Sequence, residues 1–576
     1  PAPPTVGDLE VLMRRAAQVR LNWTAVEDPQ TGPMDYYEIR CAIDEDLSFA
    51  NWDSAMVFVD AADDLDGESD GTDQHFDAHV DKSGNKIRAG HTYSCGIRGV
   101  NTVGLQSDIV LWSTINDSHI GFVSHGTVIE GYTQADYGYY KWPAINPAGD
   151  INGDGYDDML AGYGETGVFS AAGLIMGSST GPQTPFDITC DDGSFGQAMA
   201  GVGDFDNDGF PDFAVGAPDE DTVYLFRGNA DIGSAPIDCS DADITIFGPS
   251  GYSFGEGLSP ACNFDGDEYK DIVIGAKYAN DWDGAAFIVF GREESWPITI
   301  NLDESNPPTI NADGALHLVG PTSAGGLFGG STSSCDFNKD GLADIILASP
   351  WGGTDGKGAV GILTGYEAEK TQDVIYALDA SSELTWINSP SATWADMGFR
   401  GITTLDFDKD GWNDMAVGGH LGEQTGPNDS GNVHFFLNDG SGDLSTTSSN
   451  YIYGDTINES YGLPVAQTNN RTIRTPVPWR VNGLPDEPTD QVIFAGSQEF
   501  EPSGWYSTGP GFASLFYVDF QGVLSTADAD VIFMPPGDAV SYHWTEFVGD
   551  INGDGYVDFA IGDTQYDTGG RISIFY

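Results

Sequence analysis

The chain of 576 residues is poor in positive charge. It has 22 Lys and Arg residues against 89 Asp and Glu residues, which gives a formal net charge of −67. Such an acidic surface repels nucleic acids and anionic membranes, so neither is an expected partner. Part of the excess must be neutralised by bound cations. The rest is typical of a solvated acidic surface in a protein of marine or halophilic source, and an acidic surface directed at a basic partner is the weaker alternative.

Long apolar runs are also missing. No segment is long enough to span a bilayer, and no signal-peptide pattern begins at residue 1. The opening PAPPTVGDLEVL looks like an interdomain linker entering a strand, so we expect a mature form or a piece of a longer extracellular chain. Six Cys residues are few for this length, so disulfides are not the main scaffold.

Glycine, in contrast, is abundant, with 76 residues, and 40% of the chain is apolar. This composition predicts a folded protein with many tight turns, and the length exceeds one ordinary core. A short acidic motif recurs in six clear copies: GDINGDGYDDMLAG (149–162), GDFDNDGFPDFAVGAP (203–218), CNFDGDEYKDIVIGAK (262–277), CDFNKDGLADIILASP (335–350), LDFDKDGWNDMAVGGH (405–420) and GDINGDGYVDFAIG (549–562). A seventh, VNGLPDEPTDQVIFAGS (481–497), is worn.

The repeat predicts a β-propeller. The motifs begin 54 to 76 residues apart, a spacing that suits four strands with their loops. Apolar stretches with period-2 alternation and glycine-rich turns indicate strands throughout, so seven four-stranded blades are expected. The last repeat ends after its third strand, and residues 126–132, ahead of the first motif, supply the missing one. We therefore expect residues 118–576 to form an all-β, seven-bladed ring that this N-terminal strand closes.

The acidic motif has the spacing of a cation loop. Oxygens at its first, third, fifth and ninth places, with the seventh carbonyl, converge on one point when the loop curls, and such a set suits Ca²⁺ rather than Zn²⁺. The expected ligands, of about six structural Ca²⁺ ions, are Asp150, Asn152, Asp154, Tyr156, Asp158, Asp204, Asp206, Asp208, Phe210, Asp212, Asn263, Asp265, Asp267, Tyr269, Asp271, Asp336, Asn338, Asp340, Leu342, Asp344, Asp406, Asp408, Asp410, Trp412, Asp414, Asp550, Asn552, Asp554, Tyr556 and Asp558.

An EF-hand is the obvious alternative for such a loop, but it requires a bidentate Glu at the twelfth place. The twelfth places here are all apolar: Ala161, Val215, Ile274, Leu347, Val417 and Ile561. The EF-hand is therefore rejected. For the worn copy at 482–490, a turn that holds no metal is the favoured interpretation.

The aromatic-Gly pair, the acidic loop and the strand ending in Gly-Ala-Pro, as in FGQAMAGVGDFDNDGFPDFAVGAP (195–218), resemble the FG-GAP repeat. Seven such repeats with a closing N-terminal strand resemble the propeller head of integrin α subunits and its prokaryotic relatives over residues 119–576. The departures are the worn sixth loop, Glu268, and Met397 in place of an aromatic residue. The resemblance implies structural Ca²⁺ on the lower face and ligand contacts from loops of the opposite, upper face.

Residues 1–117 differ from the repeats and resemble a fibronectin type III module, an immunoglobulin-like sandwich. Trp23 would be its core aromatic residue and Tyr93 its strand-F tyrosine. Alternation places Cys41 and Cys95 on the inner face of neighbouring strands, where a disulfide and two buried thiols are both open. Of the four further cysteines, Cys190 and Cys239 are candidates for a disulfide. Cys262 and Cys335 are expected to be buried and unpaired.

The leading function hypothesis is an extracellular adhesion or ligand-binding module for a protein or a carbohydrate, secreted or at the cell surface. The family geometry implies upper-face loops at 131–140, 275–284, 348–358, 388–398, 496–511 and 562–570. Their aromatic residues suit stacking on sugars or interface anchoring, although packing between loops is the commoner role for any one of them. The candidate ligand contacts are Tyr278, Trp282, Trp351, Trp394, Trp505 and Tyr506.

The alternative is a polysaccharide lyase or hydrolase on a propeller scaffold. Only nine His residues are present and no G-x-S-x-G motif occurs, so His543 and then His420 are the best acid/base candidates. His75 and His79 are better explained by a strand edge than by a metal site. An integrin-type D-x-S-x-S magnesium motif is not supported, because DASSE (379–383) carries Glu383 where Ser is needed, and no Arg-Gly-Asp occurs.

Overall fold

The computed structural model describes residues 10–15, 18–30, 32–43, 52, 55–59, 73–78, 93–103, 105–107, 110–115, 126–130, 145–162, 170–183, 186–191, 194–267, 269–291, 299–302, 315–320, 326–329, 332–353, 356–365, 374–376, 384–390, 397–408, 410–419, 431–438, 440, 450–453, 465–467, 492–497, 512–517, 522–525, 529, 531–533, 542–553, 557–563 and 571–575. The chain divides into two compact units. One comprises Pro1–Gly121 and Ala527–Phe533, and the other comprises Phe122–Thr526 and Met534–Tyr576.

The first unit contains two main antiparallel sheets. They have the orders β1-β2-β7 (Glu10–Arg15, Gln18–Thr24, Asp73–Ala78) and β6-β5-β8-β9 (Met56–Val59, Tyr36–Ile43, Tyr93–Val100, Val110–Ile115), beside the short pair β3-β4 (Glu27–Asp28, Gly32–Pro33). Trp23 of β2 is buried and packs edge-on against Tyr37 of β5, with 5.2 Å between ring centroids. The sheets therefore share a core. Of the two states left open for Cys41 and Cys95, the disulfide is the one observed.

Seven sheets with four main strands each form the blades of a propeller, and all of these strands except β38 (Val531–Phe533) belong to the second unit. In blade order the strands are β11 Ile145–Gly149, β12 Asp158–Gly162, β13 Ser170–Ile175 and β14 Phe186–Cys190; β15 Ala198–Gly203, β16 Asp212–Ala217, β17 Thr222–Phe226 and β19 Ile244–Phe247; β20 Phe254–Cys262, β21 Asp271–Ala276, β22 Ala285–Val289 and β24 Ala315–Val319; β25 Thr332–Cys335, β26 Asp344–Ser349, β27 Ala359–Leu363 and β29 Leu384–Asn388; β30 Met397–Leu405, β31 Asp414–Gly419, β32 Asn432–Phe436 and β33 Asn450–Tyr453; β34 Val465–Gln467, β35 Val492–Ser497, β36 Phe512–Tyr517 and β38 Val531–Phe533; β39 Tyr542–Gly549, β40 Asp558–Asp563, β41 Arg571–Phe575 and β10 Gly126–Glu130.

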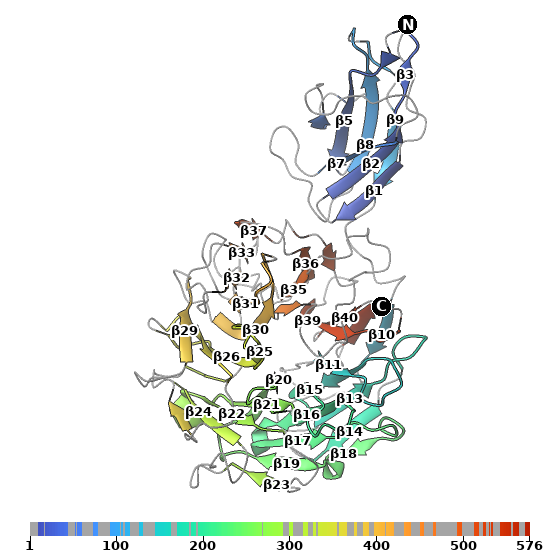
Figure 1. Cartoon of the computed structure of the whole chain (residues 1–576). Coiled ribbons are helices and arrows are strands. Elements are labelled where there is room, and N and C mark those ends of the chain that lie inside the picture. The colour runs from blue at the N-terminus through green and yellow to red at the C-terminus, as the bar shows by residue number, and fades with distance from the viewer. Residues whose placement is uncertain are drawn as a thin grey trace, which may run out of the picture. The chain divides into compact units, whose positions relative to one another are not determined.

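The innermost strands make the ring. In the order β11, β15, β20, β25, β30, β34 and β39, each contacts the next, and β39 contacts β11 again (Figure 1). Strand β10 pairs antiparallel with β41, from Gly126 opposite Phe575 to Glu130 opposite Arg571. The last sheet thus takes its outer strand from the start of the ring. The all-β, seven-bladed propeller predicted from the repeats is confirmed.

Within the described part of the chain, four outer blade edges are covered by a short fifth strand. Each runs parallel to the outer strand and comes from the next blade's connection between third and fourth strands: β18 Ile237–Asp238 on β14, β23 Thr299–Asn301 on β19, β28 Val374–Tyr376 on β24, and β37 Val523–Ser525 on β33. An open edge strand invites pairing with other chains, and these straps mask it. Cys190 at the end of β14 is disulfide-bonded to Cys239, directly after β18, so one strap is covalently attached.

The aromatic-Gly pairs bring neighbouring blades into close contact. Phe254 is fully buried, and Gly255 has a φ of 93°. The carbonyl oxygen of Gly255 lies close to Gly216 of the preceding blade. A Cβ atom on residue 216 would be only 2.1 Å from that oxygen. Glycine is therefore required at position 216 by the close approach of two backbones, and at position 255 by its left-handed conformation.

Helices are short in the described residues: η2 Pro218–Glu220, η3 Cys239–Asp241 and α1 Ala279–Trp282. Within these residues no helix has the length and hydropathy needed to cross a membrane.

One detail of the cysteine prediction is corrected. Cys262 is free as expected but half-buried rather than buried, because its thiol lies at a blade junction, 3.6 Å from Ser334 Oγ. The side chain of Cys335 lies outside the described residues.

Candidate metal loops and the opposite face

The six acidic loops occupy one place in their blades, the connection from the first strand to the second. In every copy the ninth-place Asp is the first residue of the second strand and is buried. One carboxylate oxygen accepts the N–H of the second-place residue, at 2.7 to 3.0 Å: Ile151, Phe205, Phe264, Phe337, Phe407 and Ile551. In the first five blades the other oxygen accepts an N–H just after the third strand: Gly177, Gly228, Gly291, Gly365 and Asn438.

The remaining acidic places shape the loop itself. The first-place Asp accepts the N–H of the sixth-place Gly at 2.9 to 3.0 Å in four copies: Gly155, Gly209, Gly341 and Gly411. These glycines have φ between 89° and 99°, the left-handed region that other residues rarely adopt. The fifth-place Asp accepts the seventh-place N–H in five copies: Tyr156, Phe210, Tyr269, Leu342 and Trp412. The seventh residue is thereby held in place by the loop.

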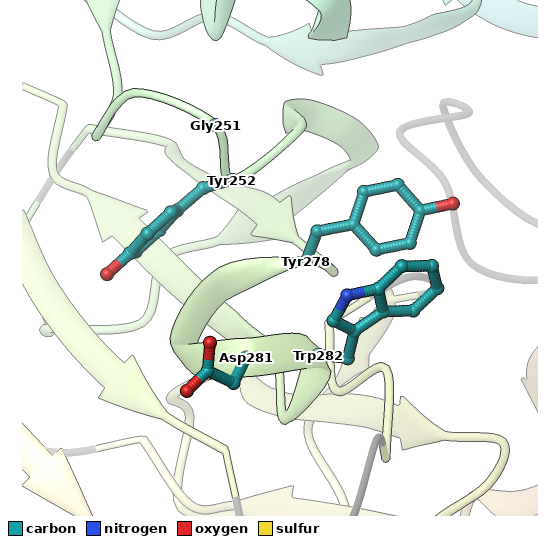
Figure 2. Close-up of a pocket in the computed structure, with 5 residues that line it drawn as sticks. All are labelled: Gly251, Tyr252, Tyr278, Asp281 and Trp282. Carbon is teal, nitrogen blue, oxygen red and sulfur yellow. The ribbon is translucent and has the colours of Figure 1, made fainter.

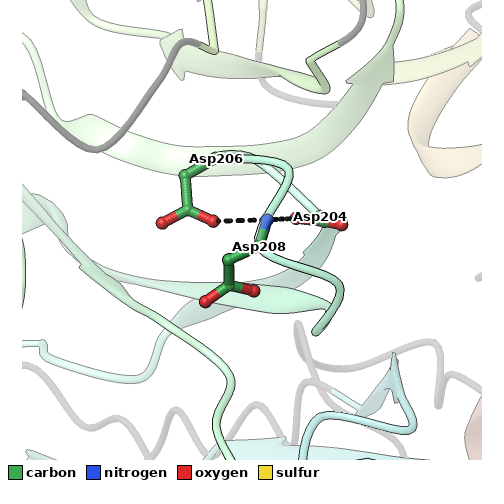
Figure 3. Close-up of side chains that lie close together, drawn as sticks. All are labelled: Asp204, Asp206 and Asp208. Carbon is green, nitrogen blue, oxygen red and sulfur yellow. Dashed lines mark hydrogen bonds between the residues drawn. The ribbon is translucent and has the colours of Figure 1, made fainter.

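The carboxylates converge as a cation site requires. Oxygens of Asp204, Asp206 and Asp208 lie within 4.8 Å of one another, and so do those of Asp406, Asp408 and Asp414. In the first cluster the N–H of Asp208 donates to Asp204 at 2.9 Å and to Asp206 at 3.2 Å (Figure 3). These bonds curl the chain so that the side chains share one side of the loop.

Two further observations fit a bound cation. Oδ1 of Asp336, the first place of the fourth loop, is buried without a hydrogen-bond partner, so an acceptor is available there for a metal. Burial also raises the pKa of the ninth-place carboxyl in three loops, to about 8 for Asp158 and Asp212 and about 7 for Asp414. A nearby positive charge would stabilise the ionised form of these buried carboxylates. A hard cation would supply that charge, and it prefers a set of oxygen ligands of this kind.

Two loops depart from the pattern. In the third, the side-chain amide of Asn263 donates to the carbonyl of Asp267, within the loop. In the second, Arg227 Nε lies 3.0 Å from Asp206 Oδ2, so a guanidinium already partners the third-place carboxylate. Sequence reasoning missed Arg227, because its contact depends on the packing of the third strand against the loop.

The predicted ligands Asp554 and Tyr556 and the worn loop at 482–490 lie outside the described residues.

The residue at the twelfth place of each loop lies in the second strand of its blade. Ala161, Val215, Ile274, Leu347, Val417 and Ile561 are all fully buried in second strands. None can turn a side chain back to the loop. The rejection of an EF-hand therefore agrees with the structure.

Strand direction places a second set of loops at the other end of each blade. In antiparallel β20, β21 and β22, the acidic loop joins the first two strands and residues 277–284 join the second and third. The two connections must lie at opposite ends of β21. The acidic loops thus define a lower face, and segments 249–253 and 277–284 belong to the upper face.

A pocket opens on this upper face, and we call it the α1 pocket. It has a volume of about 510 Å³ and is lined by Gly251, Tyr252, Tyr278, Asp281 and Trp282 (Figure 2). The Tyr278 and Trp282 rings lie together with centroids 4.6 Å apart, and Figure 2 shows Tyr252 across from them. The sequence pointed to Tyr278 and Trp282. Tyr252 was missed, because it comes from the link to the preceding blade.

The other predicted ligand contacts are more dispersed. Trp351 is 37% exposed in the corresponding loop of the next blade, where its N–H donates to the Gly326 carbonyl. It is therefore on the same face but does not line the α1 pocket. Trp394, Trp505 and Tyr506 lie outside the described residues.

The histidines considered for catalysis do not form a described site. His543 belongs to β39, and its side chain, like all of His420 and His79, lies outside the described residues. Two other histidines are buried inside blades. Burial lowers the pKa of His317 to about 4 and that of His434 to about 3, so both are neutral packing residues at physiological pH.

Comparison with known proteins supports the repeat assignment. The FG-GAP repeat model matches residues 195–235 and 328–363. Integrin alpha-4 of Xenopus laevis is 33% identical over 141 residues, which cover 22% of this chain and 14% of that protein. Integrin alpha-PS5 of Drosophila melanogaster is 32% identical over 153 residues (24% and 15%), and integrin alpha-7 of Homo sapiens is 29% identical over 138 residues (22% and 11%).

The chain therefore carries FG-GAP repeats and is similar to integrin alpha subunits. The matched part spans no more than 15% of the length of these three relatives. The similarity supports a binding module with this type of propeller, and it leaves the ligand to the chemistry of the chain itself.

Proposed function

We propose that this protein is an extracellular adhesion or ligand-binding module whose propeller is braced by calcium on the lower face and meets its ligand on the upper face. The observation that carries the proposal is the separation of two chemistries. Six acidic loops with matching hydrogen bonds lie at one end of the blades, and exposed aromatic side chains lie in loops at the other.

Calcium is the cation we propose, with about six ions. The ligands would be the oxygens at the first, third, fifth and ninth places and the seventh carbonyl of each loop, as predicted from the sequence. A hard divalent cation would neutralise carboxylates that burial leaves uncompensated and would join the two strands of each loop. Such sites function at extracellular calcium levels. Native mass spectrometry of the full chain, with and without chelator, tests the count; no added calcium mass would contradict the proposal.

We further propose that residues 1–117 are a fibronectin type III-like spacer and that residues 118–576 are the binding domain. Both disulfides suit an oxidising, extracellular setting. The partner would be an extracellular protein or a carbohydrate, with no role for nucleic acid because of the −67 charge.

Binding rather than catalysis is the activity we favour. Trp282 and Trp351 are exposed on one face at 51% and 37%. Exposed aromatic rings typically anchor ligands. Marine polysaccharides incubated with the chain test the enzymatic alternative, and release of reducing ends or unsaturated products would favour it.

The decisive experiment screens the full chain, in millimolar calcium, against arrays of extracellular proteins and glycans. We expect binding that is weakened by chelation and by the double variant Trp282→Ala/Trp351→Ala. The control is Leu105→Ala, which removes an exposed apolar side chain from the first unit. Binding that survives the double variant unchanged would refute the upper face as the ligand surface.

A further inference from the structure

We propose that the α1 pocket binds a neutral pyranose, as a free sugar or as one residue of a glycan. The apolar face of the sugar would lie against Trp282 and Tyr278, and its hydroxyls would donate to Asp281. The inference rests on the proposed function, because it names the ligand class for one site on the proposed ligand surface.

The pocket is framed by backbone hydrogen bonds from three blades. The carboxylate of Asp221, in the preceding blade, accepts the N–H groups of Gly251 and Tyr252, at 2.5 and 3.0 Å, and that of Phe254 at 3.0 Å. The N–H of Tyr278 donates to the Tyr252 carbonyl at 3.1 Å. These bonds fix the wall that carries Tyr252.

The opposite wall is held by the link to the following blade. The carbonyls of Trp282 and Asp283 accept the N–H groups of Leu327 and Phe328, at 3.0 and 3.1 Å. Both walls are therefore ordered before any ligand arrives. A preformed pocket loses little conformational entropy on binding, which favours affinity for a small ligand.

The end of α1 adopts a conformation that favours function over packing. Asp281 and Trp282 have φ of 58° and 79°, in the left-handed region, which costs of order 1 kcal/mol or more for a bulky side chain. Neither side chain is buried in the core, because Trp282 is 51% exposed, with its ring against Tyr278, and Asp281 is exposed as well. Both residues line the α1 pocket, and Figure 2 shows the indole on the side of Tyr278 and the carboxylate on the side of Tyr252.

An indole and a carboxylate that line one pocket match the two surfaces of a pyranose. The ring C–H groups form an apolar face that stacks on an aromatic ring, and the hydroxyls at the rim donate hydrogen bonds to an ionised acceptor, which are stronger than neutral ones. The volume of about 510 Å³ lies within the range of small-molecule pockets.

Charge argues against the two ionic alternatives. An anionic ligand would meet the Asp281 carboxylate in a chain of net charge −67. A cationic ligand would compete with Lys277, which does not line the pocket but whose ammonium lies 4.8 Å from the Tyr278 ring centroid and is paired with Glu256. The Tyr278 ring thus already has a cation at its face. A neutral, polyhydroxylated ligand avoids both repulsions.

The test titrates the full chain, in calcium, with neutral probes: the methyl pyranosides of glucose, galactose and mannose, and their short linear oligosaccharides. Glucuronate and N-acetyl-arginine methylamide are the anionic and cationic probes. Tryptophan fluorescence gives the affinity, and saturation-transfer NMR on the sugar protons shows which face of the sugar touches the protein. We expect a neutral sugar to bind, with its C–H face in contact.

Variants localise the binding. Trp282→Ala should weaken it about tenfold or more, since the stacking surface is lost, and Asp281→Asn should weaken it less, because an amide oxygen still accepts. Leu105→Ala should leave it unchanged, and thermal unfolding of each variant verifies the fold. Affinity unaltered by Trp282→Ala, or the arginine probe binding more tightly than every sugar, overturns the proposal.

The outcome is separable from that of the proposed function. Failure of every neutral sugar to bind at tens of millimolar overturns the pyranose inference. If array ligands are then still lost in Trp282→Ala/Trp351→Ala, the proposed function stands. If that double variant retains array binding while a sugar binds and requires Trp282, the pyranose site stands and the general ligand surface lies elsewhere.

Discussion

Asp157 and Asp550, 393 residues apart in sequence, are joined by two hydrogen bonds. The N–H of Asp550 donates to Asp157 Oδ2 at 2.9 Å, and the N–H of Asp157 donates to the Asp550 carbonyl at 3.1 Å. The second bond has a counterpart inside the ring, where Ala343 donates to the Asn263 carbonyl at 2.9 Å. The first and last blades thus meet as ordinary neighbours do, with one additional carboxylate bond at the closure.

We predict that loss of the hydrogen bond from the Asp550 N–H to the Asp157 carboxylate destabilises the closure of the ring. Asp157→Ala keeps the backbone bond, as Ala343 does, but leaves the Asp550 N–H without its charged acceptor. We expect a loss of about 1.5–3 kcal/mol in the free energy of unfolding and faster hydrogen exchange at Asp550. Asp157→Asn should recover part of it, and Asp231→Ala, at an exposed carboxylate, is the control. Unchanged exchange at Asp550 would show that the side-chain bond does not secure the closure.

Removal of calcium should destabilise the propeller in a pH-dependent way. Burial raises the pKa of Asp212 from 3.8 to about 8 in the metal-free chain. At Asp212 the folded chain then holds more protons than the unfolded chain between these values, so the stability that this carboxyl contributes without metal is present at low pH and is lost as pH rises toward 8. We expect chelator to lower the melting temperature far more at pH 8 than at pH 5.

Asp212→Asn tests the origin of that dependence. The amide keeps one acceptor for the N–H groups of Phe205 and Gly228 but cannot ionise. Its melting temperature in chelator should therefore vary less with pH than that of the parent, and calcium should restore less stability. Parallel pH profiles for variant and parent would exclude Asp212 as a source of the effect.

Arg227 should make the second loop less dependent on metal than the others. Its guanidinium partners Asp206 at 3.0 Å, whereas the corresponding place in the first blade is Met176. Arg227→Met should lower stability in chelator, because a buried carboxylate loses its partner, and should increase the stabilisation gained from calcium. Melting curves at increasing calcium measure both; a loss of stability that is the same with and without calcium would contradict this role.

The disulfide between Cys190 and Cys239 should secure the strap between the first two blades. It closes a loop of 49 residues, and Cys190→Ser/Cys239→Ser should cost about 2–4 kcal/mol, mainly through the greater freedom of the unfolded chain. Cys262→Ser, at the free thiol, is the matched control and should change little. Denaturant unfolding measures both, and equal stabilities would show that β18 is held without the bond.

Features confined to a short stretch of chain could be predicted from the sequence. The acidic loop closes within nine residues through bonds such as Gly209 to Asp204, so its residue types alone indicate the curl and the cation chemistry. Seven copies, one of them worn, that begin 54 to 76 residues apart then determined the propeller, because each four-stranded unit needs neighbours to bury its faces. The apolar twelfth places were sufficient to exclude an EF-hand, since they belong to the buried strand that follows.

Features that join different blades were decided only by the tertiary structure. Tyr252 meets Tyr278 and Trp282, Arg227 meets Asp206, and Cys190 meets Cys239 because packing of the blades brings separate segments together. Alternation along a strand indicates which face a side chain takes, but not which loop of the next blade or strand will lie opposite it. The sequence by itself determined the ring and its acidic loops, whereas the α1 pocket exists only because the fold brings the link before β20 against the loop between β21 and β22.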